Sequence, residues 1–472
     1  MERKDIKEQE LKFLAGEFKK NPGLFLRETH IDDAQFLEKI GISFPDQLQK
    51  NIFPGYLKLW PQDFIVEEIL KDGTTQTIDF NDFLKKGASE KQLTLYATLI
   101  KCGLSTIEAI EEISSFLAMD KKQIQFAGIK DKDAITAQLM SFRGLEIEKM
   151  KEISSPYFFF KDVHYGKGVV EIGGLQGNKF TILIRTNDVF EKEKFLENIE
   201  FIKKEGFFNF FYSQRFGSPR FINWFWGLSI MRGEYEKATM SFLCSQGQRE
   251  TLYFKKIRQE IKHHFGDWQK ILEICKPFPI IFQNEIKVIS YLNLNPADFI
   301  GALKQIPEQM QLWIYAYGSL LFNRKLSEYI HTGNPLPKKI PLILSANKND
   351  WSEYNEFLKE DGILEIPFNN LKPFSFIQWK KREVTTKEKI EIHALKIIPE
   401  GVVLSFSLPK GCYATSFLCH LFQLASGMPP ENISNKQIDI KEALGKESIQ
   451  TILEKFKPII FSKTENQFDK FE

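Results

Sequence analysis

The sequence predicts an α+β protein, in which a mixed, largely antiparallel sheet carries helices and a second domain is inserted into the first. Two observations predict this fold. Between residues 56 and 233, strand-like and helix-like segments mix without the strict strand–helix–strand order of a doubly wound sheet. From residue 234 to 382 the chain becomes rich in charged, helix-like segments, and a strand-like run returns at residues 401–409.

The first 55 residues are expected to form a helical extension. Leu11, Leu14 and Phe18 fall on one face of a helix, and the Asn-Pro-Gly sequence at 21–23 ends it. Nothing in these residues indicates what the extension does.

The strands of the main domain are predicted from short runs rich in apolar and β-branched residues. The first pair spans residues 55–69, where Pro61 separates two extended pieces. Further runs lie at residues 93–100, 124–129, 135–142 and 180–185.

Two helices of the main domain have recognisable ends. Ser105 and Glu108 have the spacing of a capping box, which opens a helix towards Leu117. A second helix is expected from Val189 to Lys204, closed by Gly206.

Composition excludes several classes of protein. The chain of 472 residues is 43% hydrophobic and 27% charged, which is ordinary for a globular protein. It has no run of about 18 apolar residues, so we expect no membrane span. The first twelve residues are charged and lack the apolar core of a secretory signal, so we expect a cytoplasmic protein.

Cysteines and histidines indicate neither disulfides nor a metal site. The five cysteines are odd in number, scattered, and never in Cys-x-x-Cys spacing. The seven histidines are equally dispersed. The net charge of +2 does not by itself indicate a nucleic-acid binder.

The most informative stretch is the loop that follows the run at 124–129. Gly128 allows a sharp turn, and Asp131 follows it. Residues 121–143 contain five basic and two acidic side chains, so the local net charge is positive. Nearby cations keep a carboxyl ionised, as a nucleophile or a base must be, and they attract a phosphate backbone. Without further information an ordinary solvated turn explains these charges better, and Asp133 is a rival carboxylate.

Six motifs change that balance. The loop reads G-x-K-D-x-x-A-x-T-x-Q over residues 128–138. The other five are K-x-x-P-x-D-F at 58–64, G-N-x-F at 177–180, N-x-F-x-x-Q-R-F-G at 209–217, Leu-Phe-Asn at 321–323 and L-P-x-G-x-Y-A-T at 408–415. In this order they resemble the TruD family of tRNA pseudouridine synthases, whose catalytic aspartate follows the lysine of the first motif. Six ordered motifs are very hard to obtain by chance.

The resemblance implies a pseudouridine-synthase sheet with an inserted α/β TRUD domain. Residues 1–55 would be the N-terminal helical extension, and residues 234–382 the inserted TRUD domain. Residues 56–233 and 383–472 would be the two parts of the catalytic domain.

The resemblance also implies an RNA-modifying isomerase. tRNA is the expected partner, uridine 13 in the D-arm region is the expected target, and the protein is expected to be monomeric. The reaction breaks the N-glycosidic bond, turns the uracil and joins C5 to C1′. Since it needs no redox step and no group transfer, neither a cofactor nor a metal is expected.

By resemblance, Asp131 starts glycosidic cleavage, either by adding to the nucleotide or by removing a sugar proton. The target base must leave its stack, and Phe211 is the candidate that stacks on the flipped uracil. Phe64 is a second aromatic residue near the site, with core packing as the alternative. Lys58 is expected to pair with Asp131. Asn209 is expected to hydrogen-bond the uracil edge or to brace its own loop.

Other motif residues are expected to surround these. Lys130 is expected to contact phosphate or the substrate ribose. Arg215 could bind phosphate or form a salt bridge within the fold, and Asn178 could simply belong to a turn. The residues expected to support the site are Thr136, Gln138, Asn178, Gln214 and Arg215.

One departure and one rival interpretation remain. After Y-A-T the family commonly carries Arg-Glu, whereas this chain has Cys419-His420, so an arginine charge is missing. We expect the change to affect local stability or RNA affinity more than catalysis. The resemblance implies a basic cleft for RNA between the two domains. The rival, from another class, is a catalytically silent RNA-binding or RNA-remodelling protein that kept this cleft.

Overall fold

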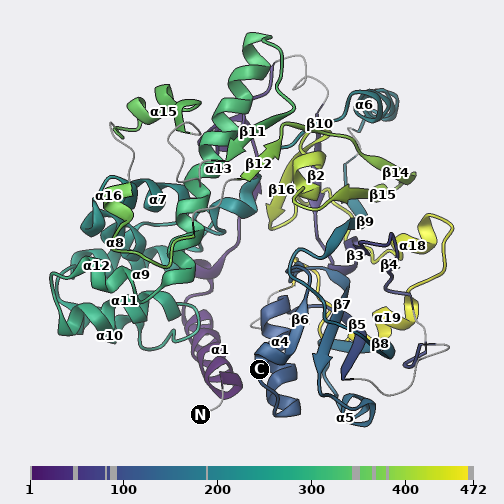
Figure 1. Ribbon diagram of the computed structural model, residues 1–472, viewed down its shortest axis with the longest axis horizontal. Helices are drawn as coiled ribbons and strands as arrows, with labels where there is room; N and C mark the ends of the chain where they lie inside the picture. The colour runs from purple at the N-terminus through teal and green to yellow at the C-terminus, as the bar shows by residue number, and fades with distance from the viewer. Residues whose placement is uncertain are drawn as a thin grey trace. The chain divides into compact units, whose positions relative to one another are not determined.

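The computed structural model describes residues 3–45, 52–79, 82–85, 93–187, 190–342, 351–363, 368–378 and 382–465. The chain forms two compact units (Figure 1). We call the first the helical unit, which comprises Met1–Gln49, Phe208–Lys387 and Asn466–Glu472. The second, the sheet unit, comprises Lys50–Phe207 and Glu388–Glu465.

The sheet unit is built on one mixed sheet. Its strands are β2 (Phe53–Leu57), β3 (Phe64–Leu70), β4 (Thr75–Gln76), β5 (Thr94–Lys101), β6 (Ile124–Phe126), β7 (Ile135–Arg143), β8 (Phe158–Gly166), β9 (Leu175–Arg185), β14 (Glu391–Ile398), β15 (Gly401–Pro409) and β16 (Phe422–Gly427). The order β16-β2-β9-β3-β7-β5-β8 forms its backbone, β15 and β14 extend it from β9, and β4 and β6 pair with β3 and β7. Only the pairs β16–β2 and β3–β7 are parallel among these described strands. The predicted mixed, largely antiparallel sheet is therefore confirmed.

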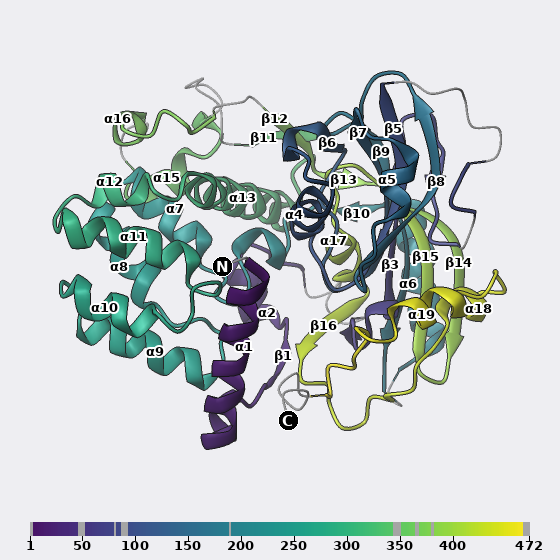
Figure 2. The same ribbon diagram turned by 90° about the horizontal axis from the view of Figure 1, so that it is seen from below.

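Helices lie on both faces of this sheet, because its strands alternate apolar side chains with a period of two. Leu95, Ala97 and Leu99 of β5 pack on the face that carries α4 (Thr106–Leu117) and α5 (Ile147–Lys151). Ile100 of β5 and Ile135 and Ala137 of β7 pack on the other face. That face carries the C-terminal helices α18 (Ile440–Ala443) and α19 (Gln450–Phe456) (Figure 2). Two shorter elements, η2 (Pro61–Asp63) and η3 (Lys121–Gln123), and the helices α6 (Lys192–Glu205) and α17 (Ala414–Leu418) complete the unit.

The capping box and the Gly206 end of the second helix agree with the structure, whereas that helix begins later than predicted. Ser105 Oγ accepts a hydrogen bond from the Glu108 N–H and Glu108 Oε2 accepts one from the Ser105 N–H, so the capping box is confirmed. The second helix begins at Lys192 and ends at Gly206, and Val189 lies outside the described residues.

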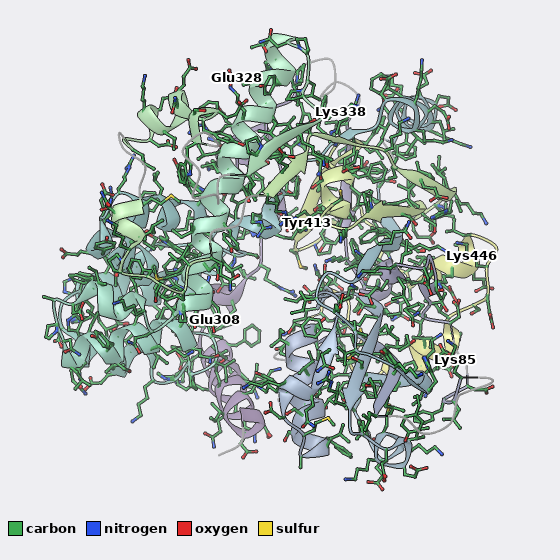
Figure 3. All side chains as sticks on the ribbon, in the orientation of Figure 1. Lys85, Glu308, Glu328, Lys338, Tyr413 and Lys446 are labelled. Atoms are coloured by element: carbon green, nitrogen blue, oxygen red, sulfur yellow. The ribbon has the colours of Figure 1, made fainter. Side chains whose placement is uncertain are left out.

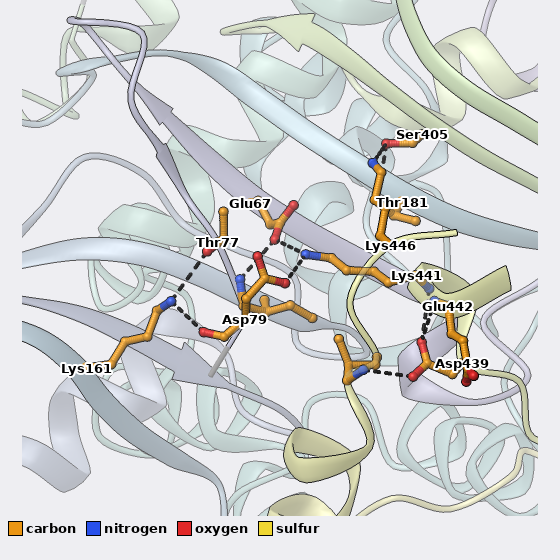
Figure 4. Close-up of polar contacts among 12 residues, drawn as sticks. Glu67, Thr77, Asp79, Lys161, Thr181, Ser405, Asp439, Lys441, Glu442 and Lys446 are labelled. Carbon is orange, nitrogen blue, oxygen red and sulfur yellow. Dashed lines mark hydrogen bonds and ion pairs between the residues drawn. The ribbon is translucent and has the colours of Figure 1, made fainter. Parts of the chain in front are cut away.

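Two adjacent carboxylates on β3 point to opposite faces of the sheet, and each has its own lysine. Glu67 binds Lys441 Nζ at 2.6 Å, and Lys441 also binds Asp79 at 2.7 Å (Figure 4). On the other face, Glu68 binds Lys130 Nζ at 2.5 Å. Because a buried charge is costly unless it is paired, these pairs fix β3 to the chain on both sides of it.

Arg185 at the end of β9 forms a third buried pair. Its Nε and Nη2 donate to the two oxygens of Asp63, both at 2.8 Å, and neither side chain is exposed. Asp63 Oδ2 also accepts the Trp60 N–H at 3.1 Å, so the pair fixes the turn that leads from β2 to β3. The guanidinium further donates to the carbonyls of Ser434 and Lys436.

The helical unit contains the N-terminal segment and the middle of the chain. Its elements are α1 (Arg3–Lys20), η1 (Pro22–Phe25), β1 (Thr29–Ile31), α2 (Ala34–Lys39), η4 (Ser213–Phe216), α7 (Asn223–Met231), α8 (Tyr235–Cys244), α9 (Leu252–His263), α10 (Trp268–Cys275), α11 (Gln283–Leu294), α12 (Phe299–Leu303), α13 (Pro307–Thr332), β11 (Lys339–Leu342), α15 (Asn355–Glu360), α16 (Phe368–Leu371) and β12 (Arg382–Thr385). Glu308 and Glu328 mark the two ends of α13, its longest described helix (Figure 3). At the junctions between the units lie β10 (Phe207–Phe208) and β13 (Lys387–Glu388).

The inserted domain, expected to be α/β, contains the two-stranded sheet of β11 and β12 among its helices. The start of the helical unit differs from the prediction. The chain enters the unit at residue 208 and not at 234, because α7 already packs against α13. The contact is close: a Cβ on Gly227 would lie 2.2 Å from the Trp313 carbonyl oxygen.

The extension predicted for residues 1–55 begins with α1, which the Asn-Pro-Gly sequence ends, and continues through η1, β1 and α2. It belongs to the helical unit, where Glu10 Oε2 accepts the Ile280 N–H at 2.7 Å and Phe13 packs edge-on against Phe278. Within the described residues, every helix is too short or too polar to cross a membrane.

The Arg185–Asp63 pair gives a stability prediction. We expect Arg185→Met to lower the free energy of unfolding by about 3–5 kcal/mol, because Asp63 keeps its burial and loses its partner. Chemical denaturation followed by circular dichroism measures this. Lys203→Met, which removes an exposed pair with Glu200, should cost at most about 1 kcal/mol. An equal decrease in the free energy of unfolding in the two variants would contradict the larger contribution assigned to the buried Arg185–Asp63 pair.

Candidate active site

The loop between β6 and β7 is held rigidly by side chains beneath it. The Lys130 N–H donates to Thr106 Oγ1 at 2.9 Å, and Gln138 Nε2 donates to the Gly128 carbonyl at 3.2 Å. Thr106 Oγ1 in turn donates to Gln138 Oε1 at 2.9 Å. The loop lacks ladder hydrogen bonds, so these side chains replace them and fix where Asp131 projects.

Lys101, the last residue of β5, is a further support that the sequence did not indicate. Its side chain is fully buried, and Nζ donates to the carbonyls of Asp131 at 2.6 Å and Leu104 at 2.8 Å. Burial lowers the pKa of Lys101 to about 8, although the nearby Asp131 carboxylate acts in the opposite direction. A lysine that ends a strand usually reaches solvent, which is why sequence reasoning missed it.

The pair of Lys58 and Asp131 that the sequence predicted is formed. Lys58 Nζ donates to Asp131 Oδ2, and the Asp133 N–H donates to Asp131 Oδ1 at 3.1 Å. Lys58 adopts a left-handed backbone conformation, with φ of +59°, which is unusual for a residue with a side chain. The side chain of Asp131 remains 34% exposed, so the carboxylate stays accessible.

The surroundings of Asp131 keep it ionised. Burial raises the pKa of its carboxyl, but the charge and hydrogen bond of Lys58, the Asp133 N–H and the charge of Lys101 together outweigh burial. The net effect is a pKa below the ordinary value of an aspartate. An accessible carboxylate of this kind can act as a nucleophile or as a base.

Phe64 lies next to this pair. Its ring centroid is 4.3 Å from Lys58 Nζ, which places the ammonium over the ring face. The ring is 4% exposed and packs against Phe180. Phe64 therefore stands at the site and in the core at once, as a platform for Lys58.

Lys130 lies in a different environment from the one expected. Its ammonium is buried on Glu68, whose other oxygen accepts the Leu139 N–H at 3.0 Å. The expected contact with phosphate or ribose does not fit this arrangement, because the Lys130 ammonium is buried and paired with Glu68 inside the sheet unit. Lys130 anchors the loop to β3.

The predicted supporting residues of the sheet unit have different surroundings. Gln138 binds the loop, as described above. Thr136 is buried in β7, and its Oγ1 has no hydrogen-bond partner among the described residues. Asn178 does not lie in a turn, because β9 runs through it. Gly177 is required there by close packing, since a Cβ would come within 2.2 Å of the Leu408 carbonyl oxygen.

The remaining predicted residues belong to the helical unit. Asn209 donates through Nδ2 to the Thr385 carbonyl at 3.1 Å, while no hydrogen bond to its Oδ1 occurs within the described part of the chain. The Phe211 ring is 3% exposed and packs edge-on against Phe322. The Arg215 guanidinium lies 5.2 Å from the Phe211 ring centroid.

Gln214 is exposed on η4, beside Arg215. The structure thus brings together Asp131, Lys58, Phe64 and Gln138 in the sheet unit, and Asn209, Phe211 and Arg215 in the helical unit. Among the described residues, no group of three or more histidine, cysteine or acidic side chains is arranged to hold a metal ion.

Comparison with known proteins connects the two sets of residues to one family. The family model of tRNA pseudouridine synthase D (TruD) matches residues 48–342, more than half of the chain. Relatives from Methanococcus vannielii and Aquifex aeolicus, which both carry tRNA pseudouridine synthase D in their names, are 31% and 26% identical. Each alignment covers 78% of this chain, with 95% and 97% of the respective relative.

A solved structure has the same fold. It is a TruD protein from Methanosarcina mazei, with a TM-score of 0.59 and 23% sequence identity. The similarity covers 81% of this chain and 96% of the other.

Removal of Lys58 should raise the pKa of Asp131. In Lys58→Met, burial keeps its effect while the opposing charge and hydrogen bond are lost, so we expect the pKa to rise. Carbon-13 NMR of labelled aspartate measures it directly. Lys132→Met is the matched control, because Lys132 is exposed and pairs with Glu108. An unchanged pKa in Lys58→Met would contradict the assigned role.

The same substitution should reverse a pH dependence of stability. In the wild type the folded pKa lies below the unfolded one, so ionised Asp131 stabilises the fold above about pH 4 and this is lost as pH falls through the folded pKa. In Lys58→Met we expect burial to raise the folded pKa of Asp131 above the unfolded one. The contribution of Asp131 to stability is then present at low pH and is lost as pH rises through the folded pKa.

Proposed function

Because the chain belongs to the TruD family of tRNA pseudouridine synthases, we propose that it isomerises a flipped-out uridine of tRNA to pseudouridine, with Asp131 as the catalytic carboxylate. The observation that carries the proposal is an accessible, ionised carboxylate on a rigid loop, paired with a lysine. The target we propose is uridine 13 in the D-arm region.

The reaction needs a carboxylate more than any other group. The bond between uracil N1 and C1′ breaks, the uracil turns, and C5 bonds to C1′, after which the proton on C5 is lost and N1 gains one. Asp131 starts the sequence as an anion, either by adding to the nucleotide or by removing a sugar proton. Lys58 keeps the anion ionised and oriented, and Phe64 holds Lys58 in turn.

The base must be held outside its stack while this happens, at a cost of roughly a few kcal/mol for extrusion. Asn209 suits the edge of uracil: its Nδ2 is engaged by Thr385, which orients the amide and leaves Oδ1 as an acceptor for the uracil N3–H. Phe211 is the proposed stacking partner. Its contact with Phe322 and Arg215 supports a ring held in a fixed orientation.

A silent RNA-binding protein is the rival, and one observation disfavours it. An ionised carboxylate beside a lysine repels phosphate and serves no purpose in a protein that only binds RNA. A binder would gain affinity by losing Asp131.

Asp131→Asn should therefore abolish turnover and leave tRNA affinity equal or higher. Pseudouridine mapping on an unmodified tRNA transcript measures the first, and filter binding at fixed salt measures the second. Asp133→Asn, which removes a neighbouring carboxylate and keeps the backbone N–H that binds Asp131, should retain turnover. Most of the activity remaining in Asp131→Asn would refute the assignment. RNA binding without product from the wild type would establish the silent binder.

Phe211→Ala should lower turnover about 5- to 150-fold, the equivalent of roughly 1–3 kcal/mol of lost stacking. Single-turnover rates with saturating enzyme measure it, on protein shown to be folded by circular dichroism. Phe322→Ala is the matched control, since it removes the ring partner and the same kind of buried contact. Equal rates for Phe211→Ala and the wild type would return Phe211 to the core.

A further inference from the structure

The N-terminal extension contacts the loop that contains Asn209 and Phe211. We call residues 209–212 the motif loop and residues 32–44 the brace. The motif loop has no helix or strand of its own. Its hydrogen bonds must therefore come from elsewhere, because buried backbone groups are costly when unpaired.

Asn323 of α13 links the brace to Phe211. Its Oδ1 accepts the Phe211 N–H at 2.9 Å, and its Nδ2 donates to the Phe211 carbonyl at 2.7 Å. The same Nδ2 donates to the Ile40 carbonyl at 2.8 Å. Asn323 is fully buried, so one side chain fixes both backbone groups of Phe211 and the brace together.

The residues on either side of Phe211 touch the brace directly. Phe44 packs edge-on against Phe210, with ring centroids 5.4 Å apart. Asp32 Oδ2 accepts the Tyr212 hydroxyl at 2.6 Å, and the other Asp32 oxygen binds Arg249. Asp32 is 6% exposed and Tyr212 is 1% exposed, so the Tyr212 hydroxyl bonds to a buried carboxylate that Arg249 neutralises.

Below these contacts the brace is held to α13. Ser327 Oγ donates a hydrogen bond to the Gly41 carbonyl at 2.9 Å and accepts one from the Ser43 N–H at 2.9 Å. Gly41 has a φ of +78°, and a Cβ there would lie 2.9 Å from the Leu320 carbonyl oxygen. These contacts fix the position of the brace on α13, so the brace can in turn fix the motif loop.

We propose that the brace is a positioning element of the catalytic machinery, in which Asp32, acting through Tyr212, fixes the motif loop so that Asn209 and Phe211 hold the uracil. This rests on the proposed function. Apolar packing alone would bury the loop at lower cost, whereas a buried carboxylate bonded to a hydroxyl also fixes the direction of the Tyr212 side chain. The brace precedes residue 48, where the match to the family model begins.

The test removes one hydroxyl group. Tyr212→Phe keeps the buried ring and loses the bond to Asp32, and Tyr253→Phe is its matched control. Tyr253 also joins its hydroxyl to a carboxylate of the extension, Glu17, but it lies on α9 and not on the motif loop. Single-turnover rates and tRNA affinity are measured for both, together with thermal unfolding. Asp32→Asn is made as well, and it replaces Tyr212→Phe should that variant not fold.

We expect Tyr212→Phe to lower the single-turnover rate roughly tenfold to hundredfold, with tRNA affinity within about twofold of the wild type. In a Phe211→Ala background, the same change should have a smaller effect, because one of the two groups it positions is gone and only Asn209 remains. Tyr253→Phe should match the wild type rate. A purely structural role predicts lower thermal stability with an unchanged rate, and that result would overturn the proposal.

Two further outcomes would also overturn it: equal rate losses in Tyr212→Phe and Tyr253→Phe, or an undiminished loss in the Phe211→Ala background. Failure of the brace and failure of the proposed function are distinguishable. If Asp131→Asn abolishes turnover while Tyr212→Phe behaves like Tyr253→Phe, only the brace fails. If the wild type makes no pseudouridine, the proposed function itself fails.

Discussion

The fold of the sheet unit is organised around one electrostatic constraint: Asp131 must stay ionised while it is partly enclosed. Burial raises the pKa of the carboxyl, and the charge and hydrogen bond of Lys58 lower it. Lys101 acts from beneath, through its charge and through its bond to the Asp131 carbonyl. Removing Lys58 would raise the pKa of Asp131, and removing Lys101 would in addition release a bond that holds the loop.

The second constraint is that β3 connects the parts of this site. Its first residue, Phe64, lies under Lys58, and its Glu68 neutralises the lysine next to Asp131. Glu67 points to the opposite face and binds Lys441. The parallel pairing of β3 with β7 brings together motifs about 70 residues apart, so the spacing of both motifs has one structural cause.

The sequence predicted the parts of this arrangement that local pattern determines. The capping box at Ser105 follows from spacing, and the strands β5 and β7 follow from their β-rich runs. The pairing of Lys58 with Asp131 was expected only from the resemblance to the TruD family. The burial of Lys130 does not follow from local pattern, because its partner Glu68 comes from another strand. The start of the helical unit at residue 208 was missed for a similar reason. The composition of the chain does not change until residue 234, whereas the packing of α7 on α13 assigns residues 208–233 to the helical unit.

The two loops that hold the proposed site residues are stabilised in the same way. Neither has a ladder of its own, and in both a buried amide side chain binds the backbone: Gln138 at Gly128, and Asn323 at Phe211. An amide can donate and accept at once, so it fixes a loop without adding charge near a substrate anion. Buried charged side chains add to this support: Lys101 binds the Asp131 carbonyl and Glu68 binds Lys130 at the first loop, and Asp32 binds Tyr212 at the second. Each loop is thus held by side chains from outside it, which leaves the surface of the first loop to Lys58 and Asp131.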